Sequence, residues 1–361
     1  MLHSNRQVHH VWRLANLVVL GIGLLASSAQ AQKFTRTDLV DQNKDPNLVN
    51  AWGVSRSSTS PWWVSDNGTG LTTLYDGAGA IQSLVVVIPN ASGQGTSAPT
   101  GQVFNYTTSF NVATGKPAVF IFVGEDGGIS GWNPGVDATH AILTVKHPDS
   151  AIYKGVALAQ SATGPRLYVT NFKSGQVEMY DGNFKPVGPR RVNQFHIPGL
   201  DQNWAPFGIQ SVGGNVVVTF AHRLPGQDDE DDGPGLGWVG VFDTEGNLLV
   251  TLEHGDFINA PWGIAMSPSD FGAFSHRLLI GNFGDGWIHA YNAFTGKHEG
   301  ALLDQNGQPI AIDGLWGLAF GNNAKAGASN ALYFSAGPNH ESQGLFGNLV
   351  PVAGDQRGSN D

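Results

Sequence analysis

Apolar residues occur along the chain in short runs that glycine-containing turns separate, and the arrangement repeats six times. Each unit opens with an apolar strand centred on a glycine. These glycines are residues 53, 101, 155, 208, 263 and 317, so successive units are 48 to 55 residues long. In four units an aromatic residue comes before the glycine, whereas two copies are weaker. The copies are Trp52-Gly53, Phe207-Gly208, Trp262-Gly263 and Trp316-Gly317, with the weaker Thr100-Gly101 and Lys154-Gly155.

Each unit continues with two more predicted strands. A β-rich run follows the glycine strand and spans 62–66, 119–125, 167–171, 216–220, 278–282 and 332–336 in the six units. A glycine turn and a third strand follow, and in five units this strand closes on an aromatic residue plus Asp or Asn, as in Tyr75-Asp76. Asp and Asn suit such an ending because their short side chains bond to turn backbone. No apolar stripe of helical period interrupts the units.

Short strands at this period predict an all-β fold, a six-bladed β-propeller with four-stranded blades. The repeated glycine is expected where neighbouring backbones approach so closely near the axis that a Cβ would clash. The predicted strand 34–40 precedes the first glycine unit, and the last unit runs out after 345–352. We therefore expect the N-terminal strand to pair into the last blade, which closes the ring and removes open sheet edges. The propeller domain is predicted to span residues 32–353.

Composition and charge narrow the class of function. Apolar residues make up 41% and charged residues only 13%, which excludes a disordered chain or a long helical bundle. With 29 acidic and 19 basic residues the formal charge is −10, so nucleic acid and anionic membranes are not expected partners. The chain has no cysteine, which excludes disulfides, thiolate catalysis and Cys-ligated metal. A small molecule or an extracellular ligand is the expected partner, and the protein is expected to be a monomer.

The first 31 residues have the pattern of a secretory signal peptide. Arg6 and Arg13 form a positive region, 14–26 is apolar, and Ala29-Gln30-Ala31 is a cleavage-type sequence. The apolar run is shorter than the ~20 residues that span a bilayer. We therefore expect a secreted or periplasmic protein without membrane insertion after cleavage. Residues 354–361 are expected to form a polar C-terminal tail.

The repeat resembles that of known six-bladed propellers. The glycine strand, the run to Asn, the glycine turn and the aromatic-Asp closure are similar to the NHL-type and gluconolactonase-like propellers. Together with the signal peptide and the Asn-Ala-Trp-Gly opening at 50–53, the chain resembles a group of uncharacterised secreted bacterial proteins. The resemblance covers nearly all of the mature chain. It implies the architecture more than the chemistry, because propellers host many unrelated functions.

Polar residues at the ends of the second strands form the first candidate site. In a radial fold Asp66, Glu125, Asn171 and Asn282 are expected to point toward one mouth of the central channel. Carboxylate and amide oxygens are ligands that Ca²⁺ prefers. The gluconolactonase-like enzymes similarly hold one axial metal with a Glu, two Asn and an Asp, although the order around the ring differs here. The alternative is that these residues only form turns.

His222 and His340 form the second candidate site. Both follow the second strands of their blades, in blades four and six, and are expected above the same mouth. A histidine there can bind a transition metal with a partner or act as a general base near neutral pH. The alternative is that both are surface residues. No His pair has the spacing of a zinc site on one element.

Blade four also carries an acidic insertion, 228–232, for which we consider a solvated loop, a cation site or a flap over the channel mouth. Three functions remain open for the whole chain. The first is an extracytoplasmic binding or scaffold propeller that recognises a ligand at the channel mouth. The second is a calcium-dependent hydrolase or lactonase using the axial carboxylates and amides. The third is a lyase or oxidoreductase that works through His222, His340 and a transition metal.

Overall fold

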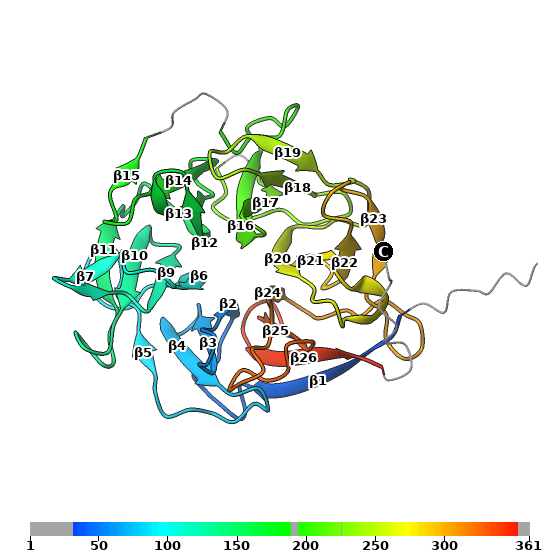
Figure 1. The fold of residues 1–361 in the computed structure, drawn as a ribbon, viewed down its shortest axis with the longest axis horizontal. Coiled ribbons are helices and arrows are strands. Elements are labelled where there is room, and N and C mark those ends of the chain that lie inside the picture. Colours follow the sequence, from blue (N-terminus) through cyan, green and yellow to red (C-terminus); the bar gives the residue numbers. More distant parts are fainter. Residues whose placement is uncertain (1–31, 189–193, 225, 353–361) are drawn as a thin grey trace, which may run out of the picture. The chain divides into compact units, whose positions relative to one another are not determined.

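The computed structural model describes residues 32–188, 194–224 and 226–352, and it has the predicted propeller architecture. Six four-stranded antiparallel sheets, the blades, are arranged around a central axis (Figure 1). Within the described residues the helical structure is one short 3-10 turn, Gly272–Phe274. A two-stranded ribbon, β7 (Asn111–Ala113) and β8 (Lys116–Pro117), lies outside the blades. The predicted signal peptide and the tail 354–361 lie outside the described residues.

Blades 1 to 3 follow one another along the chain, each running from the axis outward. Blade 1 contains β2 (Ala51–Ser55), β3 (Trp62–Asp66), β4 (Leu71–Tyr75) and β5 (Val86–Val87). Blade 2 contains β6 (Pro99–Phe104), β9 (Phe120–Gly124), β10 (Gly128–Trp132) and β11 (Ile142–Lys146). Blade 3 contains β12 (Tyr153–Ser161), β13 (Gly164–Asn171), β14 (Gln176–Tyr180) and β15 (Pro186–Val187).

Blades 4 and 5 repeat this order, and blade 6 combines the two ends of the fold. Blade 4 contains β16 (Trp204–Val212), β17 (Asn215–His222), β18 (Gly237–Phe242) and β19 (Leu248–Thr251). Blade 5 contains β20 (Pro261–Met266), β21 (Leu278–Asn282), β22 (Ile288–Tyr291) and β23 (His298–Ala301). Blade 6 contains β24 (Leu315–Phe320), β25 (Leu332–Ala336), β26 (Leu345–Pro351) and β1 (Phe34–Asp41).

The N-terminal strand closes the ring, as the sequence predicts. β1 pairs antiparallel with β26 from Phe34, opposite Pro351, to Asp41, opposite Leu345 (Figure 1). Phe34 is buried in the cluster between blades 5 and 6, and Val40 is buried against blade 1. β1 therefore covers the edge of β26 that would otherwise expose unpaired backbone groups.

The repeated glycines lie where each blade meets the next. A Cβ built at Gly101 would lie 2.6 Å from the backbone nitrogen of Val156, and one at Gly317 would lie 2.6 Å from the carbonyl oxygen of Trp52. The second of these contacts joins blade 6 to blade 1. The predicted steric reason for the glycine is therefore confirmed, because the backbones are too close for any side chain.

Candidate functional site

The first strand of each blade lines the axis, and its residues form layers along the channel. The aromatic residues that precede the repeated glycines meet in one of these layers, which we call the aromatic plug: Trp52, Phe207, Trp262 and Trp316. Trp52 and Trp316 stack with their ring centroids 3.4 Å apart, and Trp262 meets both edge-on at 5.8 Å. Trp316 is fully buried and its indole Nε1 donates to Oδ1 of Asn50 at 3.1 Å. Close aromatic packing of this kind divides the channel into two ends.

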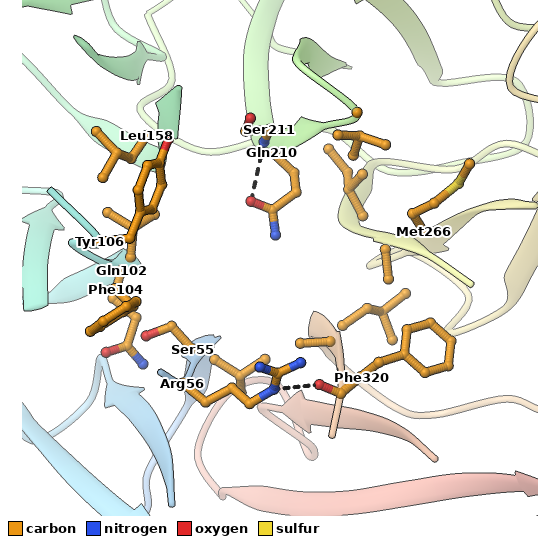
Figure 2. Close-up of a pocket in the computed structure, with 18 residues that line it drawn as sticks. Ser55, Arg56, Gln102, Phe104, Tyr106, Leu158, Gln210, Ser211, Met266 and Phe320 are labelled. Carbon is orange, nitrogen blue, oxygen red and sulfur yellow. Dashed lines mark hydrogen bonds between the residues drawn. The ribbon is translucent and has the colours of Figure 1, made fainter. Parts of the chain in front are cut away.

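One end, which we call the open end, contains a hollow of about 490 Å³ (Figure 2). Its volume is in the range of ligand-binding pockets, which is about 300–1,000 Å³. Apolar side chains make up much of its wall, with Val54, Leu158, Ile264, Met266 and Phe320 coming from four blades. A narrow extension of about 40 Å³ continues along the axis to Trp262 of the plug. The hollow is therefore a blind chamber whose floor is the plug.

Six polar side chains interrupt this apolar wall, and besides Tyr106 and Ser211 they are Gln210, Gln102, Ser55 and Arg56. Gln210 points into the middle of the hollow, and its Oε1 accepts a hydrogen bond from the Ser211 backbone at 3.2 Å (Figure 2). Gln102 is buried and donates from Nε2 to the carbonyls of Gly53 and Trp63, while its Oε1 has no partner among the described residues. The Ser55 hydroxyl is likewise buried without a described partner. Unpaired buried polar atoms are costly and often belong to a ligand site.

Arg56 is another of these polar groups and the charged residue of the lining. Its guanidinium lies at the edge of the hollow, where Nε donates to the Phe320 carbonyl at 2.7 Å (Figure 2). Nη2 donates to the Gly321 carbonyl at 2.9 Å and Nη1 to the Ser57 carbonyl at 3.4 Å. Partial burial lowers the pKa of Arg56, and no ion pair of Arg56 is found within the described residues. The guanidinium is thus held by neutral carbonyls, and its charge has no counterion there.

The other end, which we call the charged end, has the opposite character. Lys154 takes the place that an aromatic residue has in four other blades, and its side chain is only 1% exposed. The ammonium is 2.6 Å from Oε1 of Glu125, 3.0 Å from Oδ1 of Asp229 and 3.8 Å from Oε2 of Glu230. It also lies 5.1 Å from the centre of the Trp52 ring, at a distance where cation–π attraction acts.

Burial and ion pairing shift the titration of this cluster. Burial alone would lower the pKa of Lys154, but the carboxylates of Glu125, Glu230 and Asp229 raise it above its usual range. Burial raises the pKa of Glu230 to about 7, although Lys154 opposes this shift. The raised pKa values of Lys154 and Glu230 have different causes. The ammonium is closest to Glu125, whose attraction raises the pKa of Lys154. Glu230 lies farther away, so desolvation of its carboxylate outweighs the attraction of the ammonium.

Hydrogen bonds extend the cluster around the mouth. The second oxygen of Glu125 accepts from Asn67 at 2.9 Å, and Asn50 donates to both Asn67 at 3.3 Å and Glu341 at 3.0 Å. Burial raises the pKa of Glu341, with Lys154 acting in the opposite direction. These bonds join blades 1, 2, 3 and 6 through side chains rather than through sheet pairing.

The acidic insertion 228–232 folds onto this mouth, as the flap hypothesis supposes. Asp229 and Glu230 reach Lys154, and the Asp231 backbone donates to the His222 carbonyl at 2.8 Å. The end of the loop is fixed by the Gly233 backbone, which donates to Oδ1 of Asn259 at 2.7 Å. The cationic partner of the acidic loop in this structure is therefore a lysine of the chain itself.

The four predicted cation ligands do not form one donor set. Asp66 is fully buried within its blade, and neither carboxylate oxygen has a described hydrogen-bond partner. Burial raises the pKa of Asp66 well above its usual range, with Asp45 adding to the shift. Glu125 is not among the neighbours that shift the pKa of Asp66, and it binds Lys154. A carboxyl group that is held neutral is a poor calcium ligand.

The two predicted amide ligands are also engaged within their own blades. Asn171 donates to Oε1 of Glu178 at 2.7 Å, and its oxygen accepts from the Ile152 and Ser174 backbones. Asn282 donates from Nδ2 to the Phe257 carbonyl at 2.9 Å and to Asp285 at 3.1 Å, whereas its buried Oδ1 has no described partner. Across the described part of the chain no group of three or more His, Asp or Glu side chains is arranged to hold a metal ion. Each of the four residues has its own local surroundings in this structure, and the axial calcium ion stays a prediction.

The two predicted histidines, His222 and His340, have different surroundings. Nδ1 of His222 is 3.1 Å from Oδ2 of Asp231, and its ring packs edge-on against Trp204. His340 is exposed and has a left-handed backbone with a φ of 52°. No described contact joins the two side chains. A catalytic role for either residue stays a prediction.

The residues of the open end are not among the predicted site residues, although departures from the repeat mark them. Gln102 follows Gly101 at a position where the other five blades have Val, Ile or Leu. Arg56 is three residues after its glycine, where blades 3, 5 and 6 have Leu158, Met266 and Phe320. Lys154 likewise replaces an aromatic residue. In each case the departure from the repeat marks the polar residue that faces the channel.

Comparison with known proteins supports the fold and leaves the chemistry open. No family model matches the chain. An uncharacterised protein of Acanthamoeba polyphaga mimivirus is 28% identical over 314 residues, which cover 85% of this chain and 81% of the relative. A second uncharacterised protein of the same virus is 28% identical over 313 residues, covering 84% and 76%. Because these relatives are viral, the bacterial and secreted parts of the resemblance stay predictions.

Solved structures agree with the propeller architecture. A glucose dehydrogenase superposes with a TM-score of 0.55 at 12% identity, covering 88% of this chain and 100% of that one. A Bacteroides thetaiotaomicron protein of unknown function gives a TM-score of 0.52 at 8% identity, covering 88% and 76%. At these identities the likeness concerns the fold alone. A search of the described residues for a membrane-crossing helix finds none of sufficient length and apolar character.

Proposed function

We propose that this chain is a binding propeller that takes a small, partly apolar ligand into the open end of its channel. The observation that carries the proposal is the blind chamber of about 490 Å³, whose apolar wall is interrupted by polar atoms without partners. Pockets of this kind bind ligands through buried apolar area and a few polar contacts that fix orientation. At the charged end, by contrast, the central position is taken by Lys154, whose ammonium is already paired with Glu125 and Asp229.

A binding role is favoured over a catalytic role by the residues around the chamber. The described lining contains no His, Asp, Glu, Lys or Cys, and no base of these types lies in it to activate the hydroxyls of Ser55, Ser211 and Tyr106. Arg56 and the two glutamines can orient a ligand but do not exchange protons near neutral pH. The proposal therefore assigns recognition to the open end and no reaction step.

The proposal is tested with N-phenyl-1-naphthylamine, a neutral apolar dye whose fluorescence rises when it leaves water. We expect saturable binding with one site per chain. The variant Gln210→Trp fills the hollow from the residue that points into it, and it is expected to abolish binding. The matched control Gln343→Trp adds the same ring to an exposed position in the loop after β25 and is expected to bind like the parent. Dye binding that survives Gln210→Trp unchanged would overturn the proposal.

A further inference from the structure

The open end carries an unneutralised positive charge beside an apolar wall. Within the described residues, Arg56 is the charged group that lines the hollow, and its hydrogen-bond partners are three backbone carbonyls. Arg36, Arg166 and Arg277, by contrast, each form an ion pair with a carboxylate. A partly desolvated cation without a counterion favours an anionic ligand over a neutral or cationic one.

The geometry of Arg56 leaves donors for such a ligand. An arginine has five N–H groups in a planar fork, and three are used by the Phe320, Gly321 and Ser57 carbonyls. The remaining N–H groups are on the terminal nitrogens, which lie at the edge of the hollow in Figure 2. The three carbonyl contacts fix the guanidinium plane in advance. Little side-chain entropy is then lost when a planar anion binds.

The neighbouring polar atoms complement this donor set. Gln210 directs its amide into the hollow, and its oxygen is already engaged by the Ser211 backbone, so the amide nitrogen is the part left to donate. The Ser55 hydroxyl is next to Arg56 in the chain and has no described partner. Leu158, Ile264 and Met266 lie in blades 3 and 5 and offer an apolar surface for the rest of the ligand.

We infer that the ligand of the open end is an amphipathic organic acid, whose carboxylate binds Arg56 and whose hydrocarbon part covers the apolar wall. This inference rests on the proposed binding function and adds the chemical class of the ligand. The two parts of such a molecule match the two parts of the lining. A carboxylate accepts two parallel N–H bonds from the fork of an arginine, and a hydrocarbon chain gains by leaving water.

The test uses three eight-carbon probes that differ in the head group: octanoate, 1-octanol and octylammonium. Each probe competes with N-phenyl-1-naphthylamine for the parent protein. We expect octanoate to displace the dye at a concentration about tenfold below that of octanol, because a carboxylate accepts charge-assisted hydrogen bonds from the guanidinium that a hydroxyl cannot form. Octylammonium is expected to be the weakest of the three.

Three variants assign the preference to Arg56. Arg56→Gln is expected to make octanoate and octanol displace the dye equally well, with each probe compared at the dye affinity of that variant, and Arg56→Lys is expected to restore part of the octanoate advantage. The control Lys146→Gln removes one positive charge from an exposed position on β11 and is expected to keep the full advantage. Equal displacement by octanoate and octanol in the parent would overturn the inference but leave the binding function intact. Absence of dye binding in the parent would overturn the binding function itself.

Discussion

The two ends of the channel are built from the same repeated strands yet have opposite character. At the open end the strands surround a hollow with many apolar side chains, and the one cation of the described lining lacks a counterion. At the charged end the same strands begin around a buried lysine that three carboxylates surround. The aromatic plug separates the two. The charged end pairs its lysine with carboxylates of the same chain and links blades, whereas the open end leaves apolar surface and an unpaired cation available to a ligand.

The largest expected effect comes from removing the wall between the two ends. Trp316→Ala deletes a fully buried ring that stacks on Trp52 and Phe283, and it is expected to lower the free energy of unfolding by about 3–5 kcal/mol. Chemical denaturation measures this loss. The control Phe294→Ala removes an aromatic ring that is 88% exposed and is expected to change stability by less than about 0.5 kcal/mol. A similar loss of unfolding free energy in both variants would show that the aromatic plug does not stabilise the propeller.

The second effect concerns the buried cation of the charged end, Lys154. Lys154→Met keeps the length of the side chain but leaves Glu125 and Glu230 without their cation. Breaking a buried ion pair on one side costs about 3–5 kcal/mol, and we expect about 3 here because Glu125 is partly exposed to water. The double variant Lys154→Met with Glu125→Gln is expected to recover part of the loss. Unchanged stability of Lys154→Met would contradict the structural role of the charged end.

The third effect is a pH dependence that belongs to the charged end. Because the pKa of Glu230 rises from 4.5 to about 7 on folding, the folded state binds a proton between these values that the unfolded state releases. Stability contributed by this group is therefore full below about pH 4.5 and is lost as the pH rises through about 7, at up to about 1.4 kcal/mol per pH unit. The groups around it are Lys154, Asp229 and Glu341.

Glu230→Gln tests this dependence. The variant is expected to remove the slope between pH 5 and 7 that Glu230 contributes and to be the more stable protein above pH 7. Asp66, whose pKa is also raised by burial, gives a slope of the same sign that this substitution leaves in place. The measurement is thermal unfolding of both proteins across the pH range. Parallel pH profiles would show that Glu230 does not titrate differently in the folded state.

The smallest effect is expected at the open end. The amide of Gln210 contacts the backbone of its own neighbour and projects into the hollow, so Gln210→Ala is expected to change the free energy of unfolding by less than about 0.5 kcal/mol. Its effect on octanoate binding is expected to be larger than its effect on stability. A loss of stability comparable to that of Lys154→Met would remove the distinction between the two ends.

The comparison also shows how far sequence reasoning reaches. The spacing of glycine predicts six blades and the closing strand, because backbone contact between blades tolerates no side chain at those positions. The aromatic residues before four of the six glycines belong to the same periodic pattern, and they fill the axis. Strand ends such as Asp66 are predicted at the right places in the blades, but their side-chain directions depend on local register. Asp66 turns into its own blade, and Asn171 and Asn282 bond to neighbours within theirs.

The residues of the open end follow from departures from the pattern rather than from the pattern itself. Arg56, Gln102 and Lys154 each replace an apolar or aromatic residue of the other blades. In the sequence, such a substitution appears only as a poorer match to the repeat. The arrangement of the six blades shows that the substituted residue faces the channel. The buried position of Lys154 depends on its ion pairs with Asp229 and Glu230. These residues belong to the acidic loop, which is not part of the repeat, so the repeat alone does not predict the pairing.

The most direct test of the account is the location of a bound organic acid in crystals of the protein. Crystals soaked with 8-bromooctanoate give an anomalous signal at the bromine, while the electron density locates the carboxylate. The account predicts the carboxylate at Arg56 and the bromine against the apolar wall near Leu158, Ile264 and Met266. Bromine density at the charged end beside Lys154, or an empty hollow at a saturating concentration, would contradict it.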